Sequence, residues 1–446
     1  MTVSEKSKKL ISMIEKSGYE AYEVGGCVRD RLMNREFDDI DITTSATPDE
    51  IEKILKKSNI KYIETGLKHG TVTALLDNSS FEITTYRTDG GYADSRHPDS
   101  VSFVTDIKED LSRRDFTINA MAYNEAVGLV DLYGGRDDIN NKIIRTVGDA
   151  DKRFNEDALR IMRALRFASV LGFAIEESTE KAAFKNKELL KNISYERLFA
   201  ELSKLLMGDY VFDVLVRYKE IIAVFIPELE PMFEVGQATK WHIYDVWKHT
   251  CRAVECSPKD LSLRLTMLFH DTGKPFAKTT DENGADHFRG HQKISEQICG
   301  PVLKRLKVSN EIYDRVMTLV PIHDMHISTD RKKIKKWMSK LGEDRLLDLV
   351  EVKRADKLAQ NPEMTEAELA NLEITEKEIH SIISQGDPFT VKDLKINGND
   401  LISLGYKGRE IGEELNTLLE RVINEEIENT EASLKAEAEK NRLSHF

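Results

Sequence analysis

The stretch Asp38-Asp39-Ile40-Asp41-Ile42-Thr43 decides how the first part of this chain folds. Successive side chains of a strand point to opposite faces, so Ile40 and Ile42 are expected to share the buried face. Asp39 and Asp41 then point together to the other face. Two carboxylates so close repel each other unless a cation lies between them, and Mg²⁺ held by carboxylates and substrate phosphates meets that need. The alternative is a solvated strand edge.

Two glycines precede this strand. Gly25 and Gly26 follow the short β-rich run Tyr22-Glu23-Val24 and lead into a predicted helix that carries Arg29. Glycine lets a phosphate approach the backbone, and a helix N-terminus favours anions. The Arg29 guanidinium adds a charge-assisted hydrogen bond. The alternative is an ordinary tight turn.

A third acid follows in a predicted hairpin. Residues Thr71 to Leu76 and Phe81 to Tyr86 are expected to pair around Asp77-Asn78-Ser79-Ser80. Glu82 alternates with apolar residues, so it faces the polar side. If this strand pairs beside Asp41, Glu82 becomes a third carboxylate at the same place. Three carboxylates that hold two ions near a triphosphate are typical of in-line phosphoryl or nucleotidyl transfer.

A basic segment comes next, Arg113-Arg114-Asp115-Phe116-Thr117-Ile118-Asn119. Arg113 and Arg114 are candidates to hold phosphates, and Asn119 is a candidate to bond a sugar hydroxyl. The alternative is a surface cluster of ion pairs.

A candidate base-reading pair lies where the pattern becomes helical. We expect residues 156–171 to form a long helix, on which Asp157 and Arg160 share a face. A carboxylate beside a guanidinium matches the amine and ring nitrogen of cytosine and adenine, and it rejects guanine and uracil, which present the reverse pattern. Arg163 and Arg166 continue the basic edge. The alternative is an ion pair on a helix surface.

Five motifs occur in one order along the chain. They are Gly25-Gly26-x-Val28-Arg29-Asp30, Asp39-x-Asp41, Arg113-Arg114-Asp115, Asp131-x-Tyr133-Gly134-Gly135-x-x-Asp138 and Glu156-Asp157-x-x-Arg160. Together they resemble the class II tRNA nucleotidyltransferases, which are the CCA-adding enzymes and the related bacterial poly(A) polymerases. Ser194-x-Glu196-Arg197 and Glu201 resemble the neck segment of that family. The chain departs from the pattern in having Asp137 and Asp138 in succession, so either is a candidate for the motif aspartate.

The resemblance implies an α+β fold, with a small polymerase-beta-like head followed by helical neck, body and tail. We expect the head at 1–145, a base- and RNA-binding neck at 146–230, the body at 231–375 and a tRNA-binding tail at 376–446. It implies Mg²⁺ at Asp39 and Asp41, base selection by Asp157 and Arg160, and tRNA, CTP and ATP as partners.

A loop bears on which nucleotides are added. Thr85-Tyr86-Arg87 and Tyr92-x-Asp94-x-Arg96-x-Pro98 resemble the family's flexible loop, which accompanies the switch from C to A. The resemblance therefore favours full CCA addition over A-only addition or poly(A) synthesis, which stay as alternatives.

The second half carries an ordered set of histidines and aspartates that resembles the HD metal-dependent phosphohydrolase superfamily. The resemblance implies His249, His270, Asp271 and Asp356 as metal ligands, and His291 and His323 as second-metal ligands or phosphate binders. Nitrogen and oxygen ligands suit several divalent ions, transition metals included. A hydrolase whose head only binds nucleotide is the competing class of function, ahead of a non-catalytic RNA-binding protein.

Composition limits the remaining possibilities. The chain has 446 residues, a net charge of −13, 40% hydrophobic residues and no long apolar run, which excludes a disordered or membrane-spanning protein. The four cysteines form no CxxC pair, so we expect a reducing, cytoplasmic setting. The pattern specifies no oligomeric state. Lys407, Arg409 and the neck arginines are candidate contacts to RNA phosphates.

Overall fold

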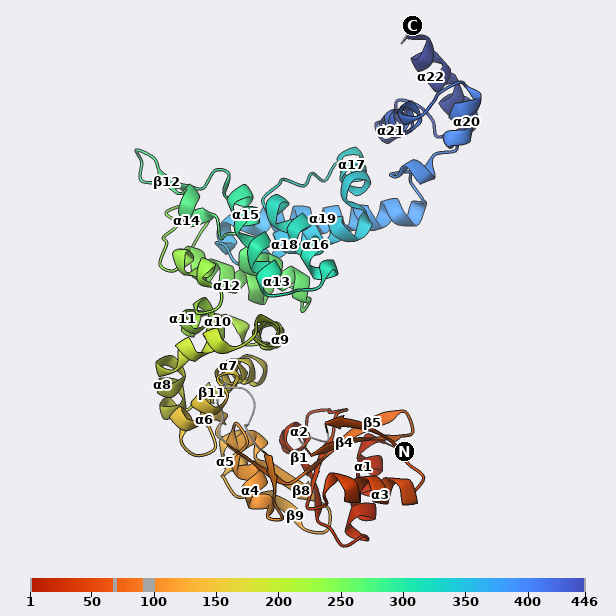
Figure 1. The fold of residues 1–446 in the computed structure, drawn as a ribbon. Helices are drawn as coiled ribbons and strands as arrows, with labels where there is room; N and C mark the ends of the chain where they lie inside the picture. The colour runs from red at the N-terminus through yellow and green to blue at the C-terminus, as the bar shows by residue number, and fades with distance from the viewer. Residues whose placement is uncertain (1, 67–69, 91–100, 445–446) are drawn as a thin grey trace. The chain divides into compact units, whose positions relative to one another are not determined.

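The computed structural model describes residues 2–66, 70–90 and 101–444 of the chain. These residues form two compact units, Met1–Pro227 and Glu228–Phe446, and each unit is described by itself. Figure 1 shows the mixed sheet near the N-terminus and the helices that follow it. Within the part of the chain that is described, we find no helix with both the length and the apolar character needed to cross a bilayer. The predicted mixed head and mostly helical remainder are confirmed.

The first unit is built on a seven-stranded sheet in the order β3-β4-β5-β2-β1-β8-β9. Its strands are β1 (Ala21–Val24), β2 (Asp41–Thr44), β3 (Lys61–Gly66), β4 (Thr71–Leu76), β5 (Ser79–Thr85), β8 (Met121–Asn124) and β9 (Gly128–Asp131). The β2–β5 pair is parallel and the other neighbouring pairs are antiparallel. A separate ribbon joins β6 (Arg87–Asp89) to β7 (Val101–Phe103). The loop residues 92–98 that the sequence singled out lie outside the described residues.

One face of the sheet is apolar and is covered by helices α1 (Val3–Glu15) and α3 (Pro48–Lys57). Ile42 and Ile83 pair on this face and are fully buried. Helix α3 begins at Pro48, where Thr47 and Glu50 form a capping box at its N-terminus. The opposite face carries a second apolar cluster, which includes Val24 and Leu111, and Asp41 lies on this face directly opposite Val24.

The predicted hairpin is confirmed, but its turn is shorter than expected. Only Asp77 and Asn78 form the turn, with φ of +47° and +62°, while Ser79 and Ser80 belong to β5. Two-residue turns whose backbone matches strand twist need positive φ at both positions, and Asp and Asn tolerate that conformation.

The rest of the first unit is mostly helical. Its helices are α2 (Gly26–Leu32), α4 (Ile107–Ser112), α5 (Gly135–Asn140), α6 (Ala150–Glu156), α7 (Leu159–Leu171), α8 (Glu177–Lys185), α9 (Tyr195–Leu206), α10 (Val211–Arg217) and α11 (Lys219–Ala223). A short parallel ribbon of β10 (Ile143–Ile144) and β11 (Ala174–Ile175), which was not predicted, joins them.

The prediction of a single helix over 156–171 is wrong about where the helix begins. Helix α6 ends at Glu156, Asp157 is extended with φ −139° and ψ 103°, and α7 begins at Leu159. The Asp157 carboxylate accepts a hydrogen bond from the Leu159 backbone N–H at 3.0 Å. Aspartate competes with helical hydrogen bonding in this way, and an apolar stripe does not reveal it.

The second unit is helical apart from a small ribbon of β12 (Thr279–Thr280) and β13 (Asp286–His287). The helices are α12 (Val246–Cys256), α13 (Leu261–Phe269), α14 (Lys274–Ala277), α15 (His291–Arg305), α16 (Asn310–Leu319), α17 (Arg331–Leu341), α18 (Glu343–Leu358), α19 (Pro362–Gln385), α20 (Gly398–Ser403), α21 (Arg409–Ile423) and α22 (Glu431–Ser444). The last three surround their own apolar core, which contains Leu401, Leu418 and Leu434.

Candidate functional site

The polar face of the sheet gathers three carboxylates. Ile40 and Ile42 are fully buried while Asp39 and Asp41 are exposed, as predicted, although the strand itself begins only at Asp41. Parallel pairing sets Ile42 level with Ile83, so Glu82 lies next to Asp41 on the neighbouring strand. Asp41 and Glu82, 41 positions apart in the sequence, thus meet on one face.

The charges on this face are incompletely balanced. Asp41 is open to solvent on one side, yet the protein packed around its carboxyl and the charge of Asp39 raise its pKa to about 6. Glu82 raises this pKa further, and the Arg114 guanidinium opposes the rise. Three acids beside one guanidinium fit a divalent cation, because a cation relieves the repulsion that raises this pKa.

A buried aspartate that was given no role in the sequence prediction fixes the neighbouring arginines. Asp110 is fully buried and accepts hydrogen bonds from Arg113 Nη2 at 2.8 Å and Arg114 Nη2 at 3.2 Å. Asp110 lies on α4, three and four residues before these arginines, so the spacing was visible in the sequence. Arg114 also lies against Gly25, where a Cβ would stand 3.3 Å from Nη1 and where φ is +80°. The positive φ is the reason for glycine there, since the flexible end of Arg114 could shift to admit a Cβ.

Arg29 and Asn119, two of the predicted nucleotide-binding residues, form one hydrogen-bonded chain with Asp115 and Arg163. Asn119 Oδ1 accepts from Arg29 Nη1 at 2.8 Å, and Asn119 Nδ2 donates to Asp115 Oδ1 at 3.2 Å. Arg163 Nη2 lies 2.6 Å from Asp115 Oδ2. Burial opposes ionisation of Asp115, but Arg163 and these hydrogen bonds outweigh it and lower its pKa to about 2. This network links α2 of the head to α7.

The candidate base-reading residues are not paired with each other. Asp157 Oδ2 lies 3.1 Å from Arg197 Nη2, a neck residue on α9. Arg160 Nη1 lies 2.7 Å from Glu156 Oε2. The alternative of a simple Asp157–Arg160 ion pair on a helix surface is therefore wrong, because each side chain is held by a different partner. Arg166 is likewise held, at 3.2 Å from Glu201.

The two aspartates in succession have different environments. Asp138 is buried, accepts a 2.6 Å hydrogen bond from Thr117 Oγ1 and pairs with Arg145, whereas Asp137 is exposed. Asp138 also has the spacing of the motif from Gly134 and Gly135. Its contacts tie α5 to the segment that carries Asn119.

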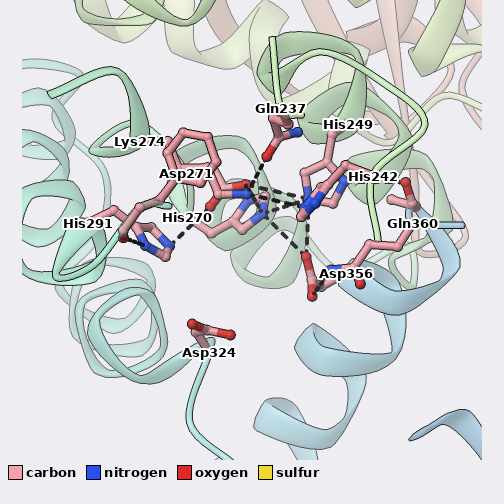
Figure 2. Close-up of polar contacts among 12 residues, drawn as sticks. Gln237, His242, His249, His270, Asp271, Lys274, His291, Asp324, Asp356 and Gln360 are labelled. Carbon is pink, nitrogen blue, oxygen red and sulfur yellow. Dashed lines mark hydrogen bonds and ion pairs between the residues drawn. The ribbon is translucent and has the colours of Figure 1, made fainter. Parts of the chain in front are cut away.

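In the second unit, the six predicted HD residues come together; five are buried and Asp356 is half-buried, and Figure 2 labels all of them except His323. Two sets of possible metal ligands share Asp271, one with His249 and His270 and the other with His291 and His323. Asp271 Oδ2 lies 3.1 Å from His270 Nε2, and Oδ1 lies 3.2 Å from His291 Nε2. Each oxygen of one carboxylate thus faces a different set.

The sixth residue and the imidazole orientations complete the cluster. Asp356 Oδ1, from α18, lies 3.1 Å from His249 Nε2. The four imidazoles each place Nδ1 on a backbone carbonyl, an arrangement that directs Nε2 to the centre as in metal sites. These carbonyls belong to Ala359 for His249, Met267 for His270, Phe288 for His291 and Val320 for His323.

Sequence reasoning missed the residues around this cluster. Lys274 Nζ lies 2.6 Å from Asp271 Oδ2, and Gln360 donates to Asp356 Oδ2 at 2.8 Å. The cluster forms one wall of a pocket of about 490 Å³, which His242 and Lys274 also line. The spacing of Lys274, three residues after Asp271, is a signal that was available.

The head fold with its acidic sheet face defines a nucleotidyltransferase-like protein. Residues 21–145 match the family described as "Poly A polymerase head domain". Residues 172–233 match an RNA- and SrmB-binding region of polymerase A, and residues 288–438 match a second domain of tRNA nucleotidyltransferases.

Relatives extend over nearly the whole chain. The CCA-adding enzyme of Lactobacillus delbrueckii subsp. bulgaricus is 36% identical over 431 residues, which is 95% of both chains. That of Pediococcus pentosaceus is 34% identical over 96% of both chains. The crystal structure of the Bacillus stearothermophilus CCA-adding enzyme with CTP superposes with a TM-score of 0.76 at 30% identity, covering 100% of this chain and 99% of that one. The chain belongs to the family of CCA-adding enzymes.

Proposed function

We propose that the head residues described above carry out the reaction of this family. The chain is a CCA tRNA nucleotidyltransferase, which adds C, C and A to the 3′ end of tRNA from CTP and ATP. The observation that carries the site assignment is the strand register that sets Glu82 beside Asp41. In keeping with the family, we place the activity in the cytoplasm.

Asp39, Asp41 and Glu82 are proposed to hold Mg²⁺. When bound, the metal neutralises phosphate charge and activates the attacking hydroxyl of the tRNA end. The chain's own residues position the nucleotide: Gly25 and Gly26 admit the triphosphate, and arginines grip it. These arginines are Arg29, Arg113 and Arg114, with Arg163 and Arg166 continuing the basic edge from α7.

Base selection is proposed for Asp157 and Arg160, with the sugar held by Asn119. Arg197 holds the Asp157 carboxylate and Glu156 holds the Arg160 guanidinium, so the two side chains are not bonded to each other. A nucleotide base that donates to the carboxylate and accepts from the guanidinium satisfies both, whereas guanine and uracil leave buried groups unpaired. We keep the division into head 1–145, neck 146–230, body 231–375 and tail 376–446 as part of this proposal.

The test is a single incubation series. The purified protein is incubated with tRNA that lacks its 3′ end, with each labelled NTP in turn and with CTP and ATP together, and the product ends are sequenced. We expect two C residues from CTP alone and CCA from the mixture. A alone would indicate A-addition, long A tails would indicate poly(A) synthesis, and efficient UTP use would contradict the base-selection proposal.

A second function, metal-dependent phosphohydrolysis, is proposed for the body. The observation that favours it is the division of four imidazoles into two sets that share Asp271, which fits two divalent ions bridged by one carboxylate. The nitrogen-rich ligand set favours a transition metal. The adjoining pocket has the size of small-molecule sites, which are about 300–1,000 Å³.

This second function is tested with 2′,3′-cyclic nucleotides and Mn²⁺, Ni²⁺, Fe²⁺, Zn²⁺ or Mg²⁺. We expect turnover with at least one transition metal, and its loss in His270→Ala and His323→Ala. No turnover with any metal would remove this function, while metal analysis would still decide whether the cluster is a structural metal site.

A further inference from the structure

The aromatic ring of Phe167, on α7, has three guanidinium groups around it. The guanidinium carbons of Arg166, Arg29 and Arg163 lie 4.2, 5.2 and 5.6 Å from the ring centroid. Cations within about 6 Å of an aromatic face are attracted by its quadrupole. The ring is only 7% exposed, so this attraction acts away from bulk water. Arg29 comes from α2 of the head, and the other two arginines come from α7 itself.

Three like charges around one ring would repel one another without compensation. Each guanidinium therefore has its own carboxylate, and the pairs are Arg29 with Asp30 at 2.8 Å, Arg163 with Asp115 at 2.6 Å and Arg166 with Glu201 at 3.2 Å. Phe116 packs against the ring edge to face, with centroids 5.8 Å apart and planes at 84°. The ring thus contacts one aromatic side chain and three guanidinium groups.

We propose that Phe167 is a positioning residue for nucleotide binding, which holds Arg29, Arg163 and Arg166 ready for the triphosphate and sugar. Arginine side chains have many rotamers, and stacking of the planar guanidinium on an aromatic face restricts them. Ordering these groups before the nucleotide arrives lowers the entropic cost of binding. The inference rests on the proposed nucleotide role of these arginines.

The test distinguishes the effect of the aromatic ring of Phe167 from the effect of its apolar volume. Phe167→Leu and Phe167→Met keep an apolar side chain but remove the ring, and Phe167→Tyr keeps the ring. With CTP and ATP as varied substrates, we expect the first two changes to raise KM about tenfold and to change kcat by less than about threefold. Phe167→Tyr should return KM to within about twofold of the parent. Should the leucine variant not fold, the methionine variant takes its place.

The matched control is Phe173→Leu, which alters another buried phenylalanine just beyond the end of α7. It should lower the melting temperature without raising KM. The inference is overturned if Phe167→Leu and Phe167→Met leave KM unchanged, if Phe167→Tyr raises KM as much as they do, or if the control raises it equally. Arg29→Ala separates this inference from the proposed nucleotide role on which it rests. If Arg29→Ala keeps the parental KM, the proposed role of the arginines is wrong. If only the Phe167 variants keep the parental KM, the arginines retain their role and only the role of the ring is wrong.

Discussion

The two carboxylate sites of this chain balance their charges in opposite ways. In the head, Asp41 is exposed beside two other acids, and its pKa is raised. In the body, Asp271 is buried, and its pKa lies well below the usual range because His270 and Lys274 outweigh the effect of burial. An acid cluster under repulsion suits a cation that arrives and leaves with substrate. A buried cluster whose charges already compensate one another suits an ion that remains bound to the folded protein.

The largest effect is expected from Asp41→Asn. Because the amide cannot replace an anionic metal ligand, CTP incorporation should fall by at least about 10³-fold. The melting temperature at neutral pH should not fall, and should rise if anything, since the change removes repulsion among the acids. Single-turnover incorporation and thermal unfolding of the same preparation measure both quantities.

Asp38→Asn is the matched control, because Asp38 is an exposed neighbour outside the proposed ligand set. It should leave incorporation within about twofold of the parent. A large loss of stability in Asp41→Asn, or an equal loss of activity in the control, would contradict the picture of the head site as an electrostatically strained cluster.

The reverse pattern is expected for His270→Ala in the body. This change removes an imidazole from the buried set, so metal measured by mass spectrometry on the purified protein should fall to background. The melting temperature should fall by several degrees, since a bound ion stabilises only the folded state. Incorporation of CTP and ATP should stay within about twofold of the parent.

His380→Ala on α19 serves as the control, since His380 is exposed and lies outside the cluster. It should keep the parental metal content. If His270→Ala abolished incorporation as Asp41→Asn does, the two sites would not be independent, and the contrast drawn between them would be lost.

The compensation of a buried carboxylate by neighbouring charges can also be tested inside the first unit, with Asp115→Asn. The pKa of Asp115 is about 2 in the folded chain against about 3.9 in an unfolded one, so ionised Asp115 stabilises the fold above about pH 4. This stabilisation, about 2–3 kcal/mol, is lost as the pH falls toward 2. Urea unfolding should therefore show a large difference between parent and variant at pH 7 and a smaller one at pH 3. Asp38→Asn, at an exposed position, should show little difference at either pH, and a pH-independent deficit in Asp115→Asn would contradict the assigned ion pair.

The contrast between the sites also explains what the sequence could reveal. The alternation of Ile40 and Ile42 with acids was readable because strand period alone determines the faces. The order of the histidines indicated a metal cluster, but the sharing of Asp271 depends on how distant helices pack. The break at Asp157 was missed because it arises from one side chain bonding to the backbone nearby, which leaves the apolar period of α7 intact. The positions of Asp110 and Lys274 at helical spacing from named site residues were visible, yet nothing in the spacing alone separates such partners from surface pairs.

The smallest effect is expected at Arg197, which holds Asp157 from the neck at 3.1 Å. In the body, most of the ligands are buried, whereas here a half-buried carboxylate is held by one side chain, Arg197, and by the Leu159 backbone N–H. Arg197→Ala should therefore free the Asp157 carboxylate without removing it, so that CTP is still used but the preference for CTP over UTP falls about fivefold in kcat/KM. Arg197→Lys should keep part of the preference, because the charge remains while the planar donor pair is lost. An unchanged preference in Arg197→Ala would mean that the extended backbone at Asp157, with its hydrogen bond to Leu159, is enough to hold the base-reading carboxylate.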